Sequence, residues 1–255
     1  MSEALAMPTT RDEDWRYADA DYLASAEPQS LTRWHDHDVP PGEIERGFAM
    51  VLPDGEIAGG VDRLRVRVGK GARYEHFVIN AGGPYARCEI EVTLEEGAHF
   101  ELGGVTLGGG EARQEIVSRV IHAEQGASSN QVVRAVHWGT STGNFLGRIE
   151  IPKDSQQTDA AQNFKAILLE AGASANAKPE LEIYADDVKA AHGAAIGALD
   201  EQAGFYMASR GIAPDVARKL LVRAFIADAF EAVADEDLRE RLFEQAIAAL
   251  DEDVL

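Results

Sequence analysis

The residue in this chain best suited to chemistry is a single histidine, His192, in the run Ala190-Ala191-His192-Gly193-Ala194. A neutral imidazole is a good ligand for iron, and histidine also carries protons near neutral pH. The small neighbours give the ring little cover, so another backbone or another subunit can approach it closely. Taken alone, the residues favour a plainer interpretation, in which the ring fills a gap beside alanines.

Five other histidines are candidate metal ligands. His35 and His37 stand two apart in the run LTRWHDHDVPPG, which its proline-glycine ending predicts to be a loop. In a strand the two rings would share a face and could form a metal pair, but no third ligand is near in sequence, so a solvated acidic loop is favoured. His99, His122 and His137 lie in separate strand-like runs, and a stacked histidine ladder is a weaker alternative.

Other reactive groups point to structural roles. The only cysteine, Cys88, stands in the strand-like run ARCEIEV and is predicted to be buried and inert. Asp186 and Asp187 are adjacent, so in a strand they would face opposite ways, and a turn with solvated carboxylates is the simpler interpretation. The sequence has no phosphate-binding glycine motif, and the run 108–110 is followed by acids and alanine rather than lysine, so we expect no bound nucleotide.

The composition describes an acidic globular protein. The 255 residues carry a formal net charge of −20, which disfavours contact with nucleic acid or anionic membranes. A single cysteine excludes an internal disulfide framework and fits a reducing compartment. With no apolar run of membrane-spanning length and no signal-peptide pattern at the amino end, we expect a cytoplasmic protein.

The elements that would position these residues are mainly strands. Between Phe48 and Leu199, short alternating runs are separated by glycine-rich turns, and the only ambiguous stretch is 164–172. A Gly-Ala step recurs at Gly71, Gly97, Gly126 and Gly172, with gaps of 26, 29 and 46, the last close to two units of 23. This spacing slightly favours a β-solenoid over an antiparallel sandwich or a cupin-like barrel. The predicted strands cover residues 63–68, 74–80, 86–94, 99–107, 115–123, 130–138, 147–151 and 181–185.

Helical patterning begins after Leu199. Asp200 is expected to cap a first helix that stops at Gly211, Pro214 to lie in the first turn of a second, and Asp235 to cap a third. The apolar stripe of these helices must pack on the β body, on a partner, or on both. The predicted stripe of the second helix consists of Val216, Leu220, Leu221, Ala224, Phe225, Ala227, Ala229, Phe230 and Val233.

Three motifs resemble the SufB/SufD family, the scaffold subunits of the Suf iron–sulfur cluster assembly system, and its SufD branch in particular. The longest is the run 182–189 (EIYADDVK) with His192-Gly193-Ala194 and the ending 209–212 (SRGI). Residues 8–17 (PTTRDEDWRY) are similar to the family motif P-x-x-R-x-E-x-W-K/R-Y. The third match is Arg148-Ile149 followed by the run 160–163 (AAQN), where the family has a similar G-R/K-I and then a Q-x-N stretch.

The resemblance implies a right-handed parallel β-helix with a carboxyl-terminal bundle of short helices. We therefore expect an amino-terminal segment at 1–45, a β-helix core at 46–198 and a helical ATPase-docking domain at 199–255. The chain is short for the family, which implies a trimmed amino-terminal region and fewer coils.

The resemblance also implies a function as a non-catalytic scaffold. His192 matches the SufD histidine that faces a SufB-like subunit, where it would supply an iron ligand or a proton relay to a transient cluster. SufC-like ATPases would dock on the helices, and the isolated chain would be a monomer or a homodimer. Some family members have a cysteine where this chain has Ala190, so this subunit would not hold a cluster alone. The alternative is a β-helix enzyme acting on polysaccharides, which needs clustered carboxylates in a groove.

Overall fold

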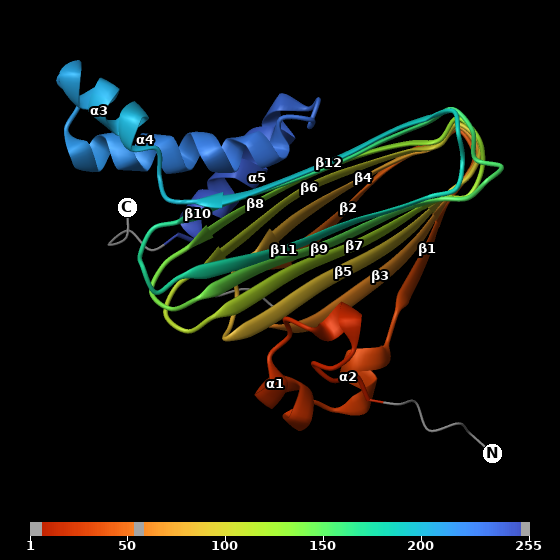
Figure 1. Ribbon diagram of the computed structural model, residues 1–255, viewed down its shortest axis with the longest axis horizontal. Helices are drawn as coiled ribbons and strands as arrows, with labels where there is room; N and C mark the ends of the chain where they lie inside the picture. The colour runs from red at the N-terminus through yellow and green to blue at the C-terminus, as the bar shows by residue number, and fades with distance from the viewer. Residues whose placement is uncertain (1–6, 54–58, 251–255) are drawn as a thin grey trace.

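The computed structural model describes residues 7–53 and 59–250, so the outermost parts of the two expected terminal domains, 1–6 and 251–255, lie outside it. The body is a parallel β-solenoid built from two six-stranded sheets, which confirms the predicted fold class (Figure 1). Sheet A contains β1 (His35–Val39), β3 (Gly60–Val68), β5 (Tyr85–Leu94), β7 (Arg113–His122), β9 (Thr142–Ile151) and β11 (Ser174–Ile183). Sheet B contains β2 (Ile44–Val51), β4 (Arg73–Asn80), β6 (His99–Gly108), β8 (Ser128–His137), β10 (Thr158–Leu168) and β12 (Val188–Gly197).

The main core lies between the two sheets. Successive strand residues point to opposite faces, so every second residue of each strand faces inward and stacks on its register partner in the next coil. Burying these side chains on both sheets supplies the main driving force for the fold. The inward apolar residues include Val66, Ile90, Val120 and Phe145 of sheet A and Phe100, Leu102, Val133 and Phe164 of sheet B.

Glycines turn the chain at one corner of the solenoid. Gly71, Gly97 and Gly126 have φ between +64° and +71°, a backbone conformation that other residues adopt only at a cost. Each of their N–H groups donates to a carbonyl in the corresponding turn of the next coil. In the next turn, between β9 and β10, Gln157 takes the glycine position with φ +62°, and its N–H donates to the carbonyl of Asp187 in the β11–β12 turn.

These corners confirm part of the predicted repeat and correct the rest. Gly71, Gly97 and Gly126 follow β3, β5 and β7 and mark successive coils. Gly172 does not belong to this set, because it lies between β10 and β11 at the opposite corner. The gap of 46 was therefore not two coils. The ambiguous stretch 164–172 is mostly strand, since β10 continues to Leu168.

The carboxyl-terminal helices cover part of the outer face of sheet B (Figure 1). As predicted, Asp200 caps α3 (Glu201–Ser209), Pro214 begins α4 (Pro214–Ala227) and Asp235 caps α5 (Glu236–Ala248). The 3-10 helix η2 (Asp228–Phe230) follows α4. Within residues 7–53 and 59–250, no helix combines the length and the apolar character needed to cross a bilayer.

The predicted apolar stripe of α4 combined two different faces of the helix. The side that packs on sheet B includes Val222 and Ile226, both fully buried, which the predicted stripe omitted. Val216 and Leu220 belonged to the predicted stripe but lie on the exposed side. Because α4 is apolar on more than one side, the sequence pattern alone could not separate the buried face from the free one.

The amino-terminal segment lies against the outer face of sheet A (Figure 1). It contains a 3-10 helix, η1 (Glu13–Trp15), and two short helices, α1 (Ala20–Ser25) and α2 (Pro28–Thr32). The loop predicted around His35 and His37 is wrong, because this stretch forms β1 and pairs with β3. The short run just before Pro40 and Pro41 gains its strand conformation from that pairing rather than from its own sequence.

Candidate functional site

The last coil of the solenoid has an open edge. Within the part of the chain that the structure describes, β11 pairs only with β9, and β12 pairs only with β10. Their outer edges therefore present backbone donors and acceptors that have no strand to pair with, which makes a template for another chain. Exposed apolar side chains lie at this edge, namely Ile183, Tyr184 and Ile196. We call β11 and β12 together with these residues the open edge.

His192 lies in the middle of this edge, on β12. Its register partner is Gln162 of β10, which is buried in the solenoid interior. Neighbours in a parallel sheet point to the same side, and Val188 and Ala190 of β12 also pack inward, so the imidazole faces the lumen of the solenoid. The ring is nevertheless exposed, because no further coil covers it. The sequence prediction did not assign this run to a strand, since its small residues hide the alternation.

Two neighbours in β10 define the surroundings of His192. Gln162 crosses the lumen, and its Nε2 donates to the carbonyl of Glu180 in β11 at 3.3 Å. On the outer face, Asn163 lies over Gly193, where an added Cβ would be only 3.1 Å from the Asn163 Nδ2. Glycine therefore lets β12 approach β10 closely beside His192. In the sequence Gln162 and Asn163 belong to a motif, but nothing local indicates that they lie beneath His192 and Gly193.

The other histidines do not assemble into a site. His35 and His37 do lie two apart in a strand, but His37 pairs with Glu45 at 2.8 Å. The histidine ladder is also wrong, because none of the register partners of these three residues is a histidine. The partners are Arg73 and Ser128 for His99, Leu94 for His122, and Gly108 and Leu168 for His137. Across the described residues, no three or more His, Cys, Asp or Glu side chains are grouped closely enough to hold a metal ion.

Three buried histidines make the fold sensitive to acid. Burial lowers the pKa of His76 and His122 to about 4 and that of His137 to about 3. The unfolded chain, with an ordinary histidine pKa near 6.5, then binds more protons than the folded chain below that pH. The free energy of unfolding should fall by about 1.4 kcal/mol per histidine for each pH unit between about 6.5 and 4.

Urea unfolding at several pH values tests this sensitivity. His137 bonds Thr106 and Ser141, and His137→Gln keeps a polar side chain there without a titrating group. We expect this variant to lose about one third of the slope of stability against pH, since one of three groups is removed. An unchanged slope would show that His137 does not contribute.

Cys88 and the aspartate pair have the structural roles that the sequence predicted. Cys88 is a free, buried thiol, and burial raises its pKa well above the usual range, so it is held as an inert thiol. Asp186 and Asp187 lie in the turn between β11 and β12. There the backbone N–H of Asp187 donates to Gln156 and its carbonyl accepts from Gln157.

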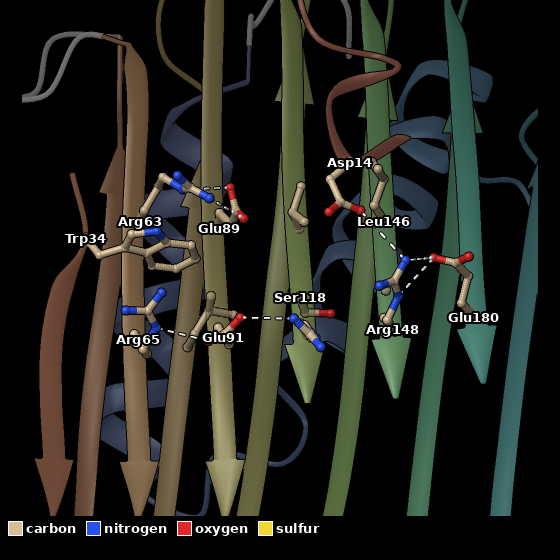
Figure 2. Close-up of a pocket in the computed structure, with 14 residues that line it drawn as sticks. Asp14, Trp34, Arg63, Arg65, Glu89, Glu91, Ser118, Leu146, Arg148 and Glu180 are labelled. Atoms are coloured by element: carbon tan, nitrogen blue, oxygen red, sulfur yellow. Dashed lines mark hydrogen bonds and ion pairs between the residues drawn. The ribbon is translucent and has the colours of Figure 1, made fainter. Parts of the chain in front are cut away.

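A hollow of about 300 Å³ lies on the outer face of sheet A, beside the amino-terminal segment (Figure 2). Its floor includes Val117 and Leu146. Four arginines and four carboxylates line it, and every one of these arginines is paired with a carboxylate. The hollow therefore has no net charge to select an anion, and its carboxylates are not free to act as the acid–base pair of a glycosidase. The charged residues are Arg63, Arg65, Arg119, Arg148, Asp14, Glu89, Glu91 and Glu180.

The comparisons with known proteins agree on one family. Residues 54–225 match the family described as the SufBD core domain of SUF system iron–sulfur cluster assembly. The chain is 31% identical over 175 residues to an iron–sulfur cluster assembly SufBD family protein of Synechocystis, which covers 68% of this chain and 39% of that protein. It is 34% identical over 121 residues to the iron–sulfur cluster assembly protein SufD of Escherichia coli, or 48% of this chain and 29% of that protein.

A SufBD family protein of Mycobacterium leprae is 30% identical over 198 residues, which covers 73% of this chain and 49% of the relative. The chain therefore spans less than half of the length of each of these three relatives. The matched range includes β12, and with it His192.

Proposed function

We propose that this chain, which belongs to the SufBD family of iron–sulfur cluster assembly proteins, is a scaffold subunit. It builds clusters together with a SufB-like subunit and SufC-like ATPases. The observation that carries the proposal is the position of His192, exposed and inward-facing on the open edge of the solenoid. A titratable ligand at an unpaired edge is suited to a site that two chains complete together.

The open edge supports pairing with a SufB-like subunit. Unpaired strand edges bind a partner through backbone hydrogen bonds, while exposed apolar side chains add burial. Ile183, Tyr184 and Ile196 supply that apolar surface on either side of the lumen. In the absence of the partner, a second copy of this chain can use the same edge, so homodimerisation competes with assembly.

The chemistry of the shared site follows from what this chain offers. His192 would bind iron through a neutral ring nitrogen or move a proton, while a cysteine and an acid would come from the partner. This chain has alanine at position 190 and keeps its only thiol buried in Cys88, so the cluster is a transient cargo. The chain performs no turnover of its own, and we place this work in the cytoplasm.

The carboxyl-terminal helices support a separate docking surface for the ATPase. Phe205 is 78% exposed and Tyr206 59% exposed on α3, and Val216 and Leu220 are exposed on α4. The opposite side of α4 is buried on sheet B, so this free apolar side is not needed for the fold. Large exposed aromatic side chains of this kind commonly anchor protein partners.

Coexpression and pull-down of the full chain with SufB-like and SufC-like partners tests both surfaces. We expect Phe205→Ser with Tyr206→Ser to lose most of the ATPase while the SufB-like subunit stays bound. Deleting the helices would be a poorer test, because it would uncover Phe77 and Val105 on sheet B. Ile44→Ser, which changes a 65% exposed residue on β2, is the matched control and should retain both partners.

If the wild-type chain holds neither partner, the scaffold role is wrong even though the family membership stands. If the double variant retains the ATPase, the docking surface lies elsewhere on the chain.

A further inference from the structure

The segment Glu13–Ala18, which we call the strap, crosses the outer face of sheet A from the middle of the solenoid to its last coil. Trp15 anchors it, since the ring is buried and lies 3.9 Å from the guanidinium carbon of Arg87 on β5. Arg113 of β7 donates to the carbonyl of Ala18 at 3.0 Å, and Asn144 of β9 donates to that of Tyr17 at 3.3 Å. The strap is therefore fixed on three successive strands of sheet A.

From this anchored position the strap reaches the last coil through its acids. Glu13 forms an ion pair with Lys178 of β11 at 2.9 Å. Asp14 points toward Arg148 of β9 (Figure 2) and lies 3.9 Å from it, and Arg148 in turn pairs with Glu180 of β11 at 3.2 Å. Glu13 thus contacts β11 directly, and Asp14 reaches the same strand through Arg148.

β11 is a strand with little support of its own. It has a neighbouring strand on one side only, and none of its residues is fully buried. On its outer face, Lys178 also forms an ion pair with Glu180 at 3.0 Å, so the lysine that meets Glu13 and the glutamate that meets Arg148 are themselves linked. On its inner face, Gln162 holds the Glu180 backbone carbonyl. The contacts converge on residues 178–180, directly across the lumen from His192.

We propose that the strap is a clamp that sets the position of β11, and that Glu13 and Asp14 are positioning residues for the open edge. By ordering the sheet A half of that edge, the strap prepares the surface on which a partner strand pairs. A preordered edge loses less conformational entropy on binding, so the strap raises affinity for the partner without touching it. This last step rests on the proposed function, whereas the clamping of β11 does not.

Hydrogen–deuterium exchange on the full chain tests the clamp directly. Glu13→Gln with Asp14→Asn removes both ion pairs and leaves the Trp15 anchor in place. We expect amide exchange in residues 174–183 to become about fivefold faster, as the loss of two partly exposed ion pairs allows. Exchange in β3 and β5, which these acids do not contact, should be unchanged. Lys178→Met removes the other partner of the Glu13–Lys178 ion pair, so it should also speed amide exchange in β11.

The matched control is Asp21→Asn with Glu27→Gln, which makes the same change of charge in the amino-terminal segment. The structure records no ion pair for either residue in the described range, so β11 should exchange as in the wild type. The clamp is refuted if the strap variant and the control give the same exchange in β11.

Partner affinity tests the second step. The strap variant should bind a SufB-like subunit about fivefold more weakly than the control, in proportion to the loosening of β11. Faster exchange with unchanged affinity would overturn the link between the clamp and docking. If the wild-type chain binds no such partner, the proposed function fails, and the exchange data alone still decide whether the clamp exists.

Discussion

Replacing His192 with alanine should abolish cluster assembly while leaving the fold and the binding of both partners intact. The side chain is exposed, and the structure records no hydrogen bond for it. Alanine already occupies positions 190 and 194 on the same face of β12, so the backbone accepts it there. We therefore expect the free energy of unfolding to change by no more than about 0.5 kcal/mol.

The functional loss should be large because the histidine would be the contribution of this chain to the shared site. Reconstitution of the variant with its partners, ferrous iron and a sulfide source should give background iron incorporation and none of the visible absorbance of a cluster. His35→Ala is the matched control, since it removes another exposed strand histidine at the opposite end of the solenoid. Normal cluster assembly by the His192 variant would refute the role assigned to it.

Replacing Glu115 with alanine should give the largest loss of stability in the chain. Glu115 and Arg87 form an ion pair at 3.2 Å, and both side chains have no exposed surface. Tyr85 and Asn144 also donate to the carboxylate of Glu115, at 3.0 and 2.9 Å. Removing it leaves a buried cation with one remaining carboxylate partner, Glu89, takes the acceptor of the Tyr85 hydroxyl, and leaves Asn144 only its longer bond to the Tyr17 carbonyl.

Breaking a buried pair in this way costs about 3–5 kcal/mol, which is a large part of the stability of an ordinary domain. Urea unfolding should show it as a marked fall in the midpoint. Glu244→Ala breaks the exposed pair between α4 and α5 and should cost at most about 1 kcal/mol. Replacing the buried pair with Arg87→Met and Glu115→Leu together should recover more than half of the loss. If Glu115→Ala lowers the free energy of unfolding no more than Glu244→Ala does, the buried cluster adds no net stability.

The sequence was informative where a strand has neighbours on both sides. The alternating run 86–94 lies within β5, and the run 115–123 overlaps β7 up to His122, because burial imposes a period of two on central strands. The same signal failed at the two ends of the solenoid. β1 is short and acidic, and β12 is built from alanine and glycine around His192, so neither shows a clear alternation.

The site was only partly predictable for a related reason. Family resemblance selected His192, but its neighbours depend on how many residues each coil contains. Gln162 lies beneath His192 because 30 residues separate the paired positions of β10 and β12, as in the pairing of Thr158 with Val188. Glu13 and Lys178 meet across 165 positions of the sequence, and no local pattern records such a contact. The exposed side of α4 could not be predicted either, because it depends on which side of the helix packs on sheet B.

The corner glycines have a consequence for how the solenoid is held together. Each turn N–H bonds the following turn, so every coil is stabilised by its two neighbours, as in a one-dimensional chain of coupled units. The terminal coil, β11 with β12, has one neighbour among the described residues, and the corner that it bonds carries Gln157 in a conformation that costs about 1 kcal/mol more than it costs glycine. Local opening is then cheapest at the coil that carries His192. A partner docked there as proposed would supply the missing neighbour, and the last coil would complete its folding as the shared site forms.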